Sequence, residues 1–165
     1  MKQILLYIII IFTFYSCKKD FPINRTTPYE TTPYKPPTPD GFPNMIIPED
    51  NPLTVEGISL GERLFHDPIL SGDSTLSCAG CHFQSSAFSD PNRFSTGINN
   101  IQGTRQASAI INAGWNSSFN WDGSANSLEE QAFEPIRNPI EMNNTWSDVE
   151  EKLNNHREYP ILFKQ

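Results

Sequence analysis

Apolar residues recur at helical spacing in four parts of the chain, while strand-like alternation is almost absent. The first part predicts a short helix that ends before the break at Asp67-Pro68, with the apolar residues Ile58, Leu60, Leu64 and Phe65. The second part predicts a helix from Arg105 to Ala113, where Ala109, Ile110 and Ala113 have helical spacing. The pattern therefore indicates an all-α domain in which long loops join short helices.

Two further helices are predicted from their N-terminal residues. Ser127 is followed three residues later by Glu130, which is a capping-box signature, and we expect this helix to end near Pro135. Thr145 precedes the last predicted helix, whose apolar face is formed by Trp146, Val149 and Leu153. Both helices lie in the second half of the chain, close to the candidate site residues described below.

The N-terminal residues have the pattern of an export signal. Residues 4–14 are almost unbroken apolar sequence, which is too short for a transmembrane helix but fits a secretory signal peptide. Cys17 follows the small residue Ser16, as in the lipobox of bacterial lipoproteins. We predict that residues 1–16 are a lipoprotein-type signal peptide and that Cys17 carries the lipid; a plain cleaved signal is the alternative. The mature protein is expected in the periplasm or cell envelope, with membrane contact through the lipid anchor alone.

Proline separates this signal from the folded part. Residues 18–52 hold nine of the 14 prolines, and residues 17–52 are predicted to be a disordered, semi-rigid tether. Residues 53–165 then form one domain of about 110 residues. Its apolar residues are few for this size, so a bound apolar cofactor would help to complete the core.

Composition excludes several classes of function. The formal net charge of −7 argues against nucleic acid as a partner, because phosphate binding requires a basic surface. The chain is too charged and too often interrupted by proline for a polytopic membrane protein. Its 3 cysteines cannot form a closed disulfide framework, so their spacing indicates another chemistry.

The segment Cys78-Ala79-Gly80-Cys81-His82 is a C-x-x-C-H motif, which attaches c-type haem. Cys78 and Cys81 would each form a thioether with a haem vinyl group, and His82 would bind the iron as the proximal ligand. A thioredoxin-like redox pair would require a βαβ context, and a zinc ribbon would require a second Cys pair. The sequence offers neither, and the export signal suits a cofactor that is attached outside the cytoplasm.

The stretch from Leu60 to Phe163 resembles the N-terminal haem domain of the bacterial di-haem cytochrome c peroxidase family. The segments that carry the resemblance occur in family order around the haem motif and are Leu60-Gly61-Glu62-Arg63-Leu64-Phe65, Asp67-Pro68, Gly103-Thr104-Arg105-Gln106, Ile111-Asn112-Ala113, Trp121-Asp122-Gly123-Ser124-Ala125, Leu128-Glu129-Glu130-Gln131-Ala132, Pro135-Ile136, Ile140-Glu141-Met142 and Tyr159-Pro160-Ile161-Leu162-Phe163. The resemblance implies a cytochrome c-like fold. It also implies haem c-dependent reduction of hydrogen peroxide to water, with electrons from a small c-type cytochrome or a similar donor.

The resemblance also assigns roles to three residues outside the haem motif. Gln131 and Glu141 match the polar pair over the distal haem face, and Trp121 matches the tryptophan between the two haems, an electron conduit. Cleaving peroxide requires a proton to move from the iron-bound oxygen to the leaving oxygen, which one carboxylate can do as base and then as acid. An amide can position the peroxide or donate to the developing charge.

Three positions depart from the family pattern. Ile98 stands where many members have a distal His ligand, so we expect a five-coordinate haem without reductive activation. Gln106 replaces an Asn that helps to hold calcium, which weakens the expectation of a calcium ion. Ser124 replaces the usual Arg, and no consequence is assigned to this change.

The chain ends at Gln165, before the second haem domain that family members contain. We expect it to be the peroxide-reducing half of a longer protein with a second haem c in the missing C-terminal domain; a split gene and a genuine mono-haem relative are the alternatives. Two other functions remain open. One is a non-enzymatic mono-haem electron-transfer cytochrome, and the other is a di-haem oxidase acting on a protein substrate.

Overall fold

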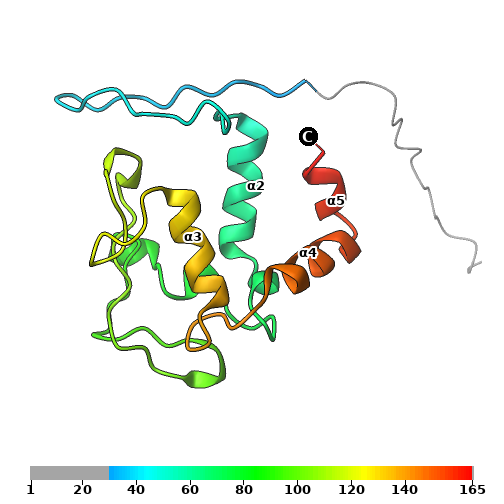
Figure 1. Cartoon of the computed structure of the whole chain (residues 1–165). Helices are drawn as coiled ribbons and strands as arrows, with labels where there is room; N and C mark the ends of the chain where they lie inside the picture. The colour runs from blue at the N-terminus through cyan, green and yellow to red at the C-terminus, as the bar shows by residue number, and fades with distance from the viewer. Residues whose placement is uncertain (1–29, 165) are drawn as a thin grey trace, which may run out of the picture.

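The computed structural model describes residues 30–164, which form short helices joined by long loops (Figure 1). The α-helices are α2 (Val55–His66), α3 (Leu128–Arg137), α4 (Trp146–Asn155) and α5 (Tyr159–Leu162). The 3-10 helices are η1 (Pro68–Leu70), η2 (Cys78–Gly80), η3 (Gln84–Ser86), η4 (Ile98–Asn100) and η5 (Ala113–Trp115). β-Structure within the described residues is restricted to isolated bridges. The predicted all-α class is confirmed, whereas the predicted signal peptide and Cys17 lie outside the described residues.

Helix α2 confirms the first predicted helix and stands at the centre of the domain. The hydroxyl of Thr54 accepts the Gly57 N–H at 3.0 Å and so caps the N-terminus. The helix stops at Asp67 because Pro68 follows, and the residue before a proline disfavours helical backbone. None of the described helices is long and apolar enough to cross a bilayer.

The predicted caps of α3 and α4 are also confirmed. Ser127 accepts the Glu130 N–H at 3.0 Å, and Thr145 accepts the Asp148 N–H at 3.2 Å. Helix α3 does not end near Pro135 as predicted but continues to Arg137. A proline in the third turn removes one hydrogen-bond donor, and the rest of the helix still forms around it.

The helix predicted from Arg105 to Ala113 is wrong, because residues 105–112 are irregular and only Ala113 belongs to a helix, the short η5. The polar backbone groups of this segment bind a neighbouring segment instead of each other. The Ala107 N–H donates to the Ser95 hydroxyl at 3.1 Å, and the Ala107 carbonyl accepts from the Ser89 hydroxyl at 2.7 Å. These contacts compete with the helix and are invisible to a local sequence pattern.

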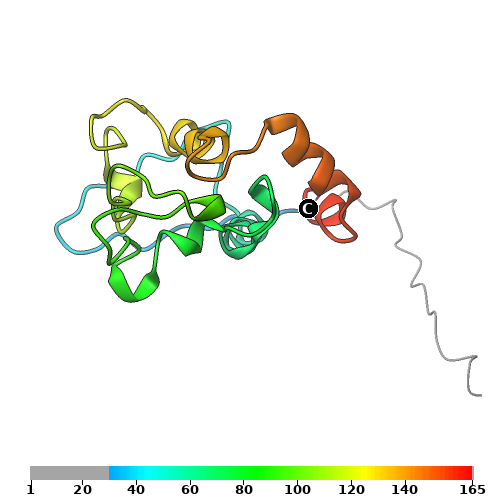
Figure 2. The ribbon, with the colours of Figure 1, turned by 90° about the horizontal axis from the view of Figure 1, so that it is seen from below.

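A small apolar core joins the helices. Its buried residues are Leu70, Ile136, Met142 and Val149, with Leu64, Ile69, Leu76, Trp146 and Leu153 packed against them. In both views α3 lies on one side of α2 and the α4–α5 pair lies on another, while the long loops occupy the side away from α4 and α5 (Figures 1 and 2). The apolar face predicted for α4 is confirmed, because Val149 belongs to the core and Trp146 and Leu153 pack against it.

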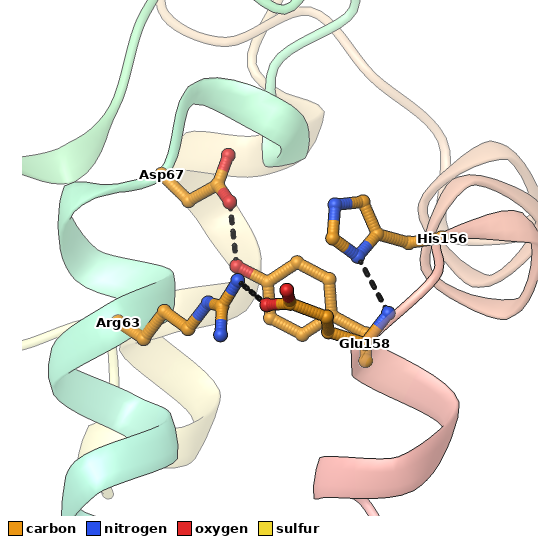
Figure 3. Close-up of polar contacts among 5 residues, drawn as sticks. Arg63, Asp67, His156 and Glu158 are labelled. Atoms are coloured by element: carbon orange, nitrogen blue, oxygen red, sulfur yellow. Dashed lines mark hydrogen bonds and ion pairs between the residues drawn. The ribbon is translucent and has the colours of Figure 1, made fainter. Parts of the chain in front are cut away.

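Polar contacts attach α5 to α2 (Figure 3). The fully buried Tyr159 donates its hydroxyl proton to Asp67 Oδ2 at 2.6 Å. Arg63 lies over the Tyr159 ring, 5.1 Å from its centroid, and forms an ion pair with Glu158. The Glu158 N–H donates to His156 Nδ1 at 3.1 Å. These contacts fix the C-terminal part of the described chain.

Residues 32–54, which we call the proline-rich loop, run back across the domain along the top of Figure 1. The base of the loop is closed by backbone hydrogen bonds, from Tyr34 N–H to the Leu53 carbonyl and from Val55 N–H to the Thr32 carbonyl, both at 2.9 Å. Farther along, the Trp115 ring N–H donates to the Pro43 carbonyl at 2.8 Å. The prediction of a disordered tether is therefore not supported for residues 32–52, which are hydrogen-bonded to the folded domain.

Candidate functional site

The C-x-x-C-H residues form a single tight turn built on η2. The Cys78 carbonyl accepts backbone N–H groups from Cys81 at 3.1 Å and from His82 at 3.0 Å. Leu76 packs closely over Gly80, since a Cβ at this position would lie 2.8 Å from Leu76 Cδ1. The turn therefore brings two thiols and an imidazole together in the way that the sequence spacing predicts.

The environment of the two thiols keeps them uncharged. Burial raises the pKa of Cys78. Burial, with the nearby negative charges of Asp90 and Glu141, raises the pKa of Cys81 to about 11. A redox-active or zinc-binding cysteine requires a lowered thiol pKa. The raised pKa values therefore disfavour both of these alternatives.

The ring of His82 is held by the backbone of the loop that follows it. Its Nδ1 lies 2.9 Å from the Phe88 carbonyl oxygen, which is an acceptor, so Nδ1 carries the proton. This contact leaves Nε2 as the nitrogen that is free to bind a metal. Ala87 and Phe88 both have left-handed backbone, with φ of 56° and 55°, which turns the Phe88 carbonyl back toward the imidazole.

Sequence reasoning did not find this second contact of the histidine. Phe88 acts through its carbonyl group, which every residue has, so its side chain gives no signal. The only sequence hint is that a ligating His requires some acceptor for its other ring nitrogen.

The carboxyl group of Glu141 is half-buried and is held by the side chain of Asn138. Asn138 Nδ2 donates to Glu141 Oε1 at 2.9 Å. Burial raises the pKa of Glu141, the hydrogen bond from Asn138 and the charge of His82 lower it, and Glu134 raises it, with a net upward shift. The Ile98 N–H donates to the Glu141 carbonyl at 2.8 Å, and Cys81 Sγ lies 3.8 Å from the carbonyl oxygen of nearby Thr96. Residues 96–98 thus connect the backbone of Glu141 with the haem-attachment turn.

Gln131 lies on α3, and Trp121 lies in the loop that precedes this helix. Gln131 is half-buried, and its side chain forms no hydrogen bond with Glu141 in the described part of the chain. Trp121 is 64% exposed, and its ring N–H donates to the Gln106 carbonyl at 3.0 Å. The amide of Gln106 in turn donates to the Asp90 carbonyl at 2.6 Å. The predicted polar pair is therefore not joined directly, and Trp121 presents its ring at the surface.

Ile98 is buried, with 4% of its surface exposed, and is adjacent to the backbone of the candidate base. Its N–H donates to the Glu141 carbonyl at 2.8 Å. Five-coordination of the haem remains a prediction. Within residues 30–164, no group of three or more His, Cys, Asp or Glu residues could hold a metal ion. Calcium binding remains a prediction.

The family model described as "Di-haem cytochrome c peroxidase" matches residues 55–165. The chain belongs to this family. The observed geometry fits the cofactor that family members carry, since paired neutral thiols and a histidine with a free Nε2 are the groups that haem c requires.

Curated members of the di-haem peroxidase family include two that illustrate its range. The chain is 41% identical to methylamine utilization protein MauG of Methylorubrum extorquens over 117 residues, which is 71% of this chain and 33% of that protein. It is 38% identical to cytochrome c peroxidase Ccp of Escherichia coli K12 over 112 residues, which is 67% of this chain and 24% of that protein. The chain thus spans a third or less of these relatives.

Solved structures of family members have the same fold. A MauG-like protein associated with microbial copper homeostasis superposes with a TM-score of 0.72 at 32% identity, over 79% of this chain and 39% of that chain. The diheme peroxidase BthA from Burkholderia thailandensis gives a TM-score of 0.55 at 26% identity, over 65% of this chain and 33% of that chain.

Proposed function

We propose that this chain is the peroxide-reducing haem domain of a di-haem cytochrome c peroxidase. One observation carries the proposal. The turn from Cys78 to His82 presents two thiols and an imidazole whose Nδ1 is held by the Phe88 carbonyl. The half-buried Glu141 is bound through its backbone to Ile98, two residues after Thr96, whose carbonyl oxygen lies 3.8 Å from Cys81 Sγ. An iron ligand, a covalent attachment site and a proton carrier are the three parts that peroxide reduction requires.

Cys78 and Cys81 would attach the haem, and His82 would bind its iron. When bound, the haem supplies the iron that takes up peroxide and the electrons that reduce it. The overall reaction consumes one hydrogen peroxide, two electrons and two protons and yields two water molecules. A second haem c is expected in the remaining part of the protein, as the family description implies.

Glu141 would move the proton within the site. The pKa of Glu141 is raised, so it lies closer to neutral pH than the pKa of an exposed glutamate does. The carboxyl group is therefore better suited to accept a proton and then release it. It would take the proton from one peroxide oxygen and deliver it to the leaving oxygen. Gln131 would orient the peroxide with its amide.

Electrons would enter from a small protein donor such as a c-type cytochrome. Trp121 is the candidate conduit, and its exposed ring is available for contact with a further domain. Covalent haem attachment suits an exported protein in the periplasm or cell envelope. The lipid at Cys17 remains part of this proposal.

A second candidate function is oxidation of a protein substrate by the same haem site. The 41% identity with methylamine utilization protein MauG supports it, because this similarity is as high as that to the peroxidases. A simple electron carrier is less well supported. Its sixth ligand would be Met142, but this side chain is 3% exposed and packs in the apolar core with Leu70, Ile136 and Val149.

The test uses the full-length holoprotein with hydrogen peroxide and a reduced small c-type cytochrome. Peroxide-dependent oxidation of the cytochrome is expected, and Glu141→Gln should slow it by a factor of about 10² or more. Glu150→Gln, an exposed change on α4, is the matched control and should leave the rate unchanged. Absence of cytochrome oxidation in the wild-type protein would refute the peroxidase assignment.

A further inference from the structure

The turn that carries Glu141 is closed by Asn138. The Asn138 carbonyl accepts the backbone N–H groups of Glu141 and Asn143, both at 3.0 Å. Its side-chain oxygen accepts the Ile140 N–H at 3.1 Å. Because Oδ1 is bound to a backbone donor, the amide has one favourable orientation, with its NH₂ group on the opposite side.

That NH₂ group donates to the carboxylate of Glu141. The distance from Nδ2 to Oε1 is 2.9 Å, and both side chains are half-buried. A hydrogen bond to an ionised acceptor is stronger than a neutral one and restricts the rotamers of a flexible glutamate. Within residues 30–164 the second oxygen, Oε2, accepts no hydrogen bond. One carboxylate oxygen is thus held and the other is free.

We propose that Asn138 is the positioning residue of the peroxide site, which holds Glu141 Oε1 so that Oε2 exchanges the proton. This inference rests on the proposed role of Glu141 and adds a residue to it. Asn138 acts by orienting the carboxylate and by stabilising its ionised form.

The backbone of the turn is fixed independently of this hydrogen bond. The Ile98 N–H donates to the Glu141 carbonyl, and the Gly72 N–H donates to the Met142 carbonyl, both at 2.8 Å. A substitution that removes only the Asn138 donor therefore leaves the backbone of Glu141 in place. The expected change is confined to the direction and protonation of its side chain.

The sign of the effect on protonation follows from the groups around the carboxyl. Burial and the charge of Glu134 disfavour the ionised form, whereas the hydrogen bond from Asn138 favours it. An iron-bound His82 is a neutral imidazole and adds no positive charge. Loss of the Asn138 donor removes a favourable contribution, so the pKa of Glu141 rises further. As the pH is lowered, Glu141 then becomes protonated at a higher pH than in the wild type. In the pH–rate profile of any step that requires ionised Glu141, the fall on the acidic side therefore begins at a higher pH.

Asn138→Asp tests the inference with a minimal change. The new side chain retains an oxygen for the Ile140 N–H, but it replaces the donor to Glu141 with a second carboxylate. Loss of the donor and the added negative charge both raise the pKa of Glu141, so Asn138→Ser, which adds no charge, is tested beside it. The probe is hydrogen cyanide binding to the ferric holoprotein, because HCN must transfer its proton to a base when it binds iron as cyanide. We expect the association rate at neutral pH to fall about tenfold or more, with the acidic limb displaced upward.

Two further measurements keep the test decisive. Infrared spectra are recorded for protein with ¹³C-labelled glutamate, and the spectrum of Glu141→Gln is subtracted to isolate the Glu141 carboxylate band. This band should be shifted in Asn138→Asp relative to the wild type. If that variant fails to fold, Asn138→Ser retains an oxygen for the turn but does not reach Glu141, and the same changes are expected. Asn51→Asp is the matched control, since Asn51 donates to the exposed Glu129 at 2.8 Å; it should alter neither readout.

The outcomes separate this inference from the proposed function. Slow cyanide binding in Glu141→Gln, with wild-type binding and an unshifted carboxylate band in the Asn138 variants, would overturn the role of Asn138 and leave the role of Glu141 intact. Wild-type cyanide binding in Glu141→Gln would overturn both.

Discussion

At the scale of single residues, the site depends on close backbone contacts that tolerate little change. Gly97 is the clearest case, because a Cβ there would clash with the Ile140 carbonyl oxygen and lie 2.8 Å from Glu141 Cα. The absence of a side chain at this position is what lets the Ile98 turn approach the backbone of Glu141. The geometry of the candidate base is therefore set partly by a residue with no chemistry of its own.

Gly97→Ala should displace Glu141 and lower stability. Crowding of this kind typically costs about 1–3 kcal/mol, and the reaction with peroxide should slow as well. Gly61→Ala is the control, since a Cβ there meets nothing within 4 Å and lies within α2. It should stabilise the protein by up to about 1 kcal/mol. Thermal unfolding of both variants checks this, and equal stability of the two would contradict the contact.

Tyr159 gives a second residue-scale prediction, which concerns pH. Burial and its hydrogen bond to Asp67 raise the pKa of Tyr159 to about 12. The phenol is therefore protonated to a higher pH in the folded protein than in the unfolded chain, where its pKa is about 10. Its contribution to stability is complete below about pH 10 and is lost as the pH rises toward about 12.

Tyr159→Phe should remove this dependence and cost about 1–3 kcal/mol below pH 10, because Asp67 Oδ2 loses its donor. Urea unfolding from pH 8 to 12 measures both effects. Tyr34→Phe, at an exposed position, should behave as the wild type does. If Tyr159→Phe loses as much stability at high pH as the wild type does, another group causes that loss.

The sequence identified the groups whose side chains carry chemistry, including Cys78, Cys81 and His82. It did not identify Asn138 or Phe88. Asn138 acts by closing a turn and donating to a neighbour three residues away, and Phe88 acts through a carbonyl. Such contacts depend on backbone direction, which residue type does not encode.

At the scale of elements, caps were predictable and non-local pairing was not. Ser127 and Thr145 mark the starts of α3 and α4, because the capping hydrogen bond lies within four residues of sequence. Residues 105–113 have helical spacing but bind residues 89–95 instead. The proline-rich loop is similar, since its composition predicts an extended backbone but not the surface that it covers.

The proline-rich loop is held by a contact that can be tested directly. Met45 Cε would lie 2.8 Å from a Cβ added to Gly114, and Phe42 meets the Trp115 ring edge-on at 5.1 Å. Gly114→Ala should therefore push Met45 away and release the loop. Faster amide hydrogen exchange at residues 34–45 is the expected result.

A double-mutant cycle supplies the control for this contact. Met45→Ala removes the atoms that the new methyl group would meet, so Gly114→Ala should cost less stability in that background than in the wild type. Equal costs in the two backgrounds would show that the loop and Gly114 are not coupled.

At the scale of the whole molecule, the domain has few buried apolar residues, and the haem is expected to supply part of the interior. Seven hydrophobic residues among those described are buried, namely Leu70, Ile98, Ala125, Ile136, Met142, Val149 and Tyr159. A haem held by thioether bonds stays attached when the chain unfolds, so it stabilises the folded state through the apolar surface that it buries only there. The haem-free protein should therefore be much less stable than the holoprotein.

Cys78→Ser combined with Cys81→Ser, produced without haem, should unfold at a lower temperature than the holoprotein and with a broader transition. Circular dichroism measures both. Because serine is nearly isosteric with cysteine, the difference reports on the haem and not on packing. Equal melting temperatures would contradict a structural role of the cofactor.

The chain spans a third or less of the relatives described above. The most direct test of the account is the pH dependence of the reaction between hydrogen peroxide and the ferric holoprotein, followed by stopped-flow absorbance. With Glu141 as the base, the rate should fall as the pH drops through the raised pKa of that group, and Glu141→Gln should be slow and nearly independent of pH. An unchanged rate and profile in Glu141→Gln would contradict the central claim.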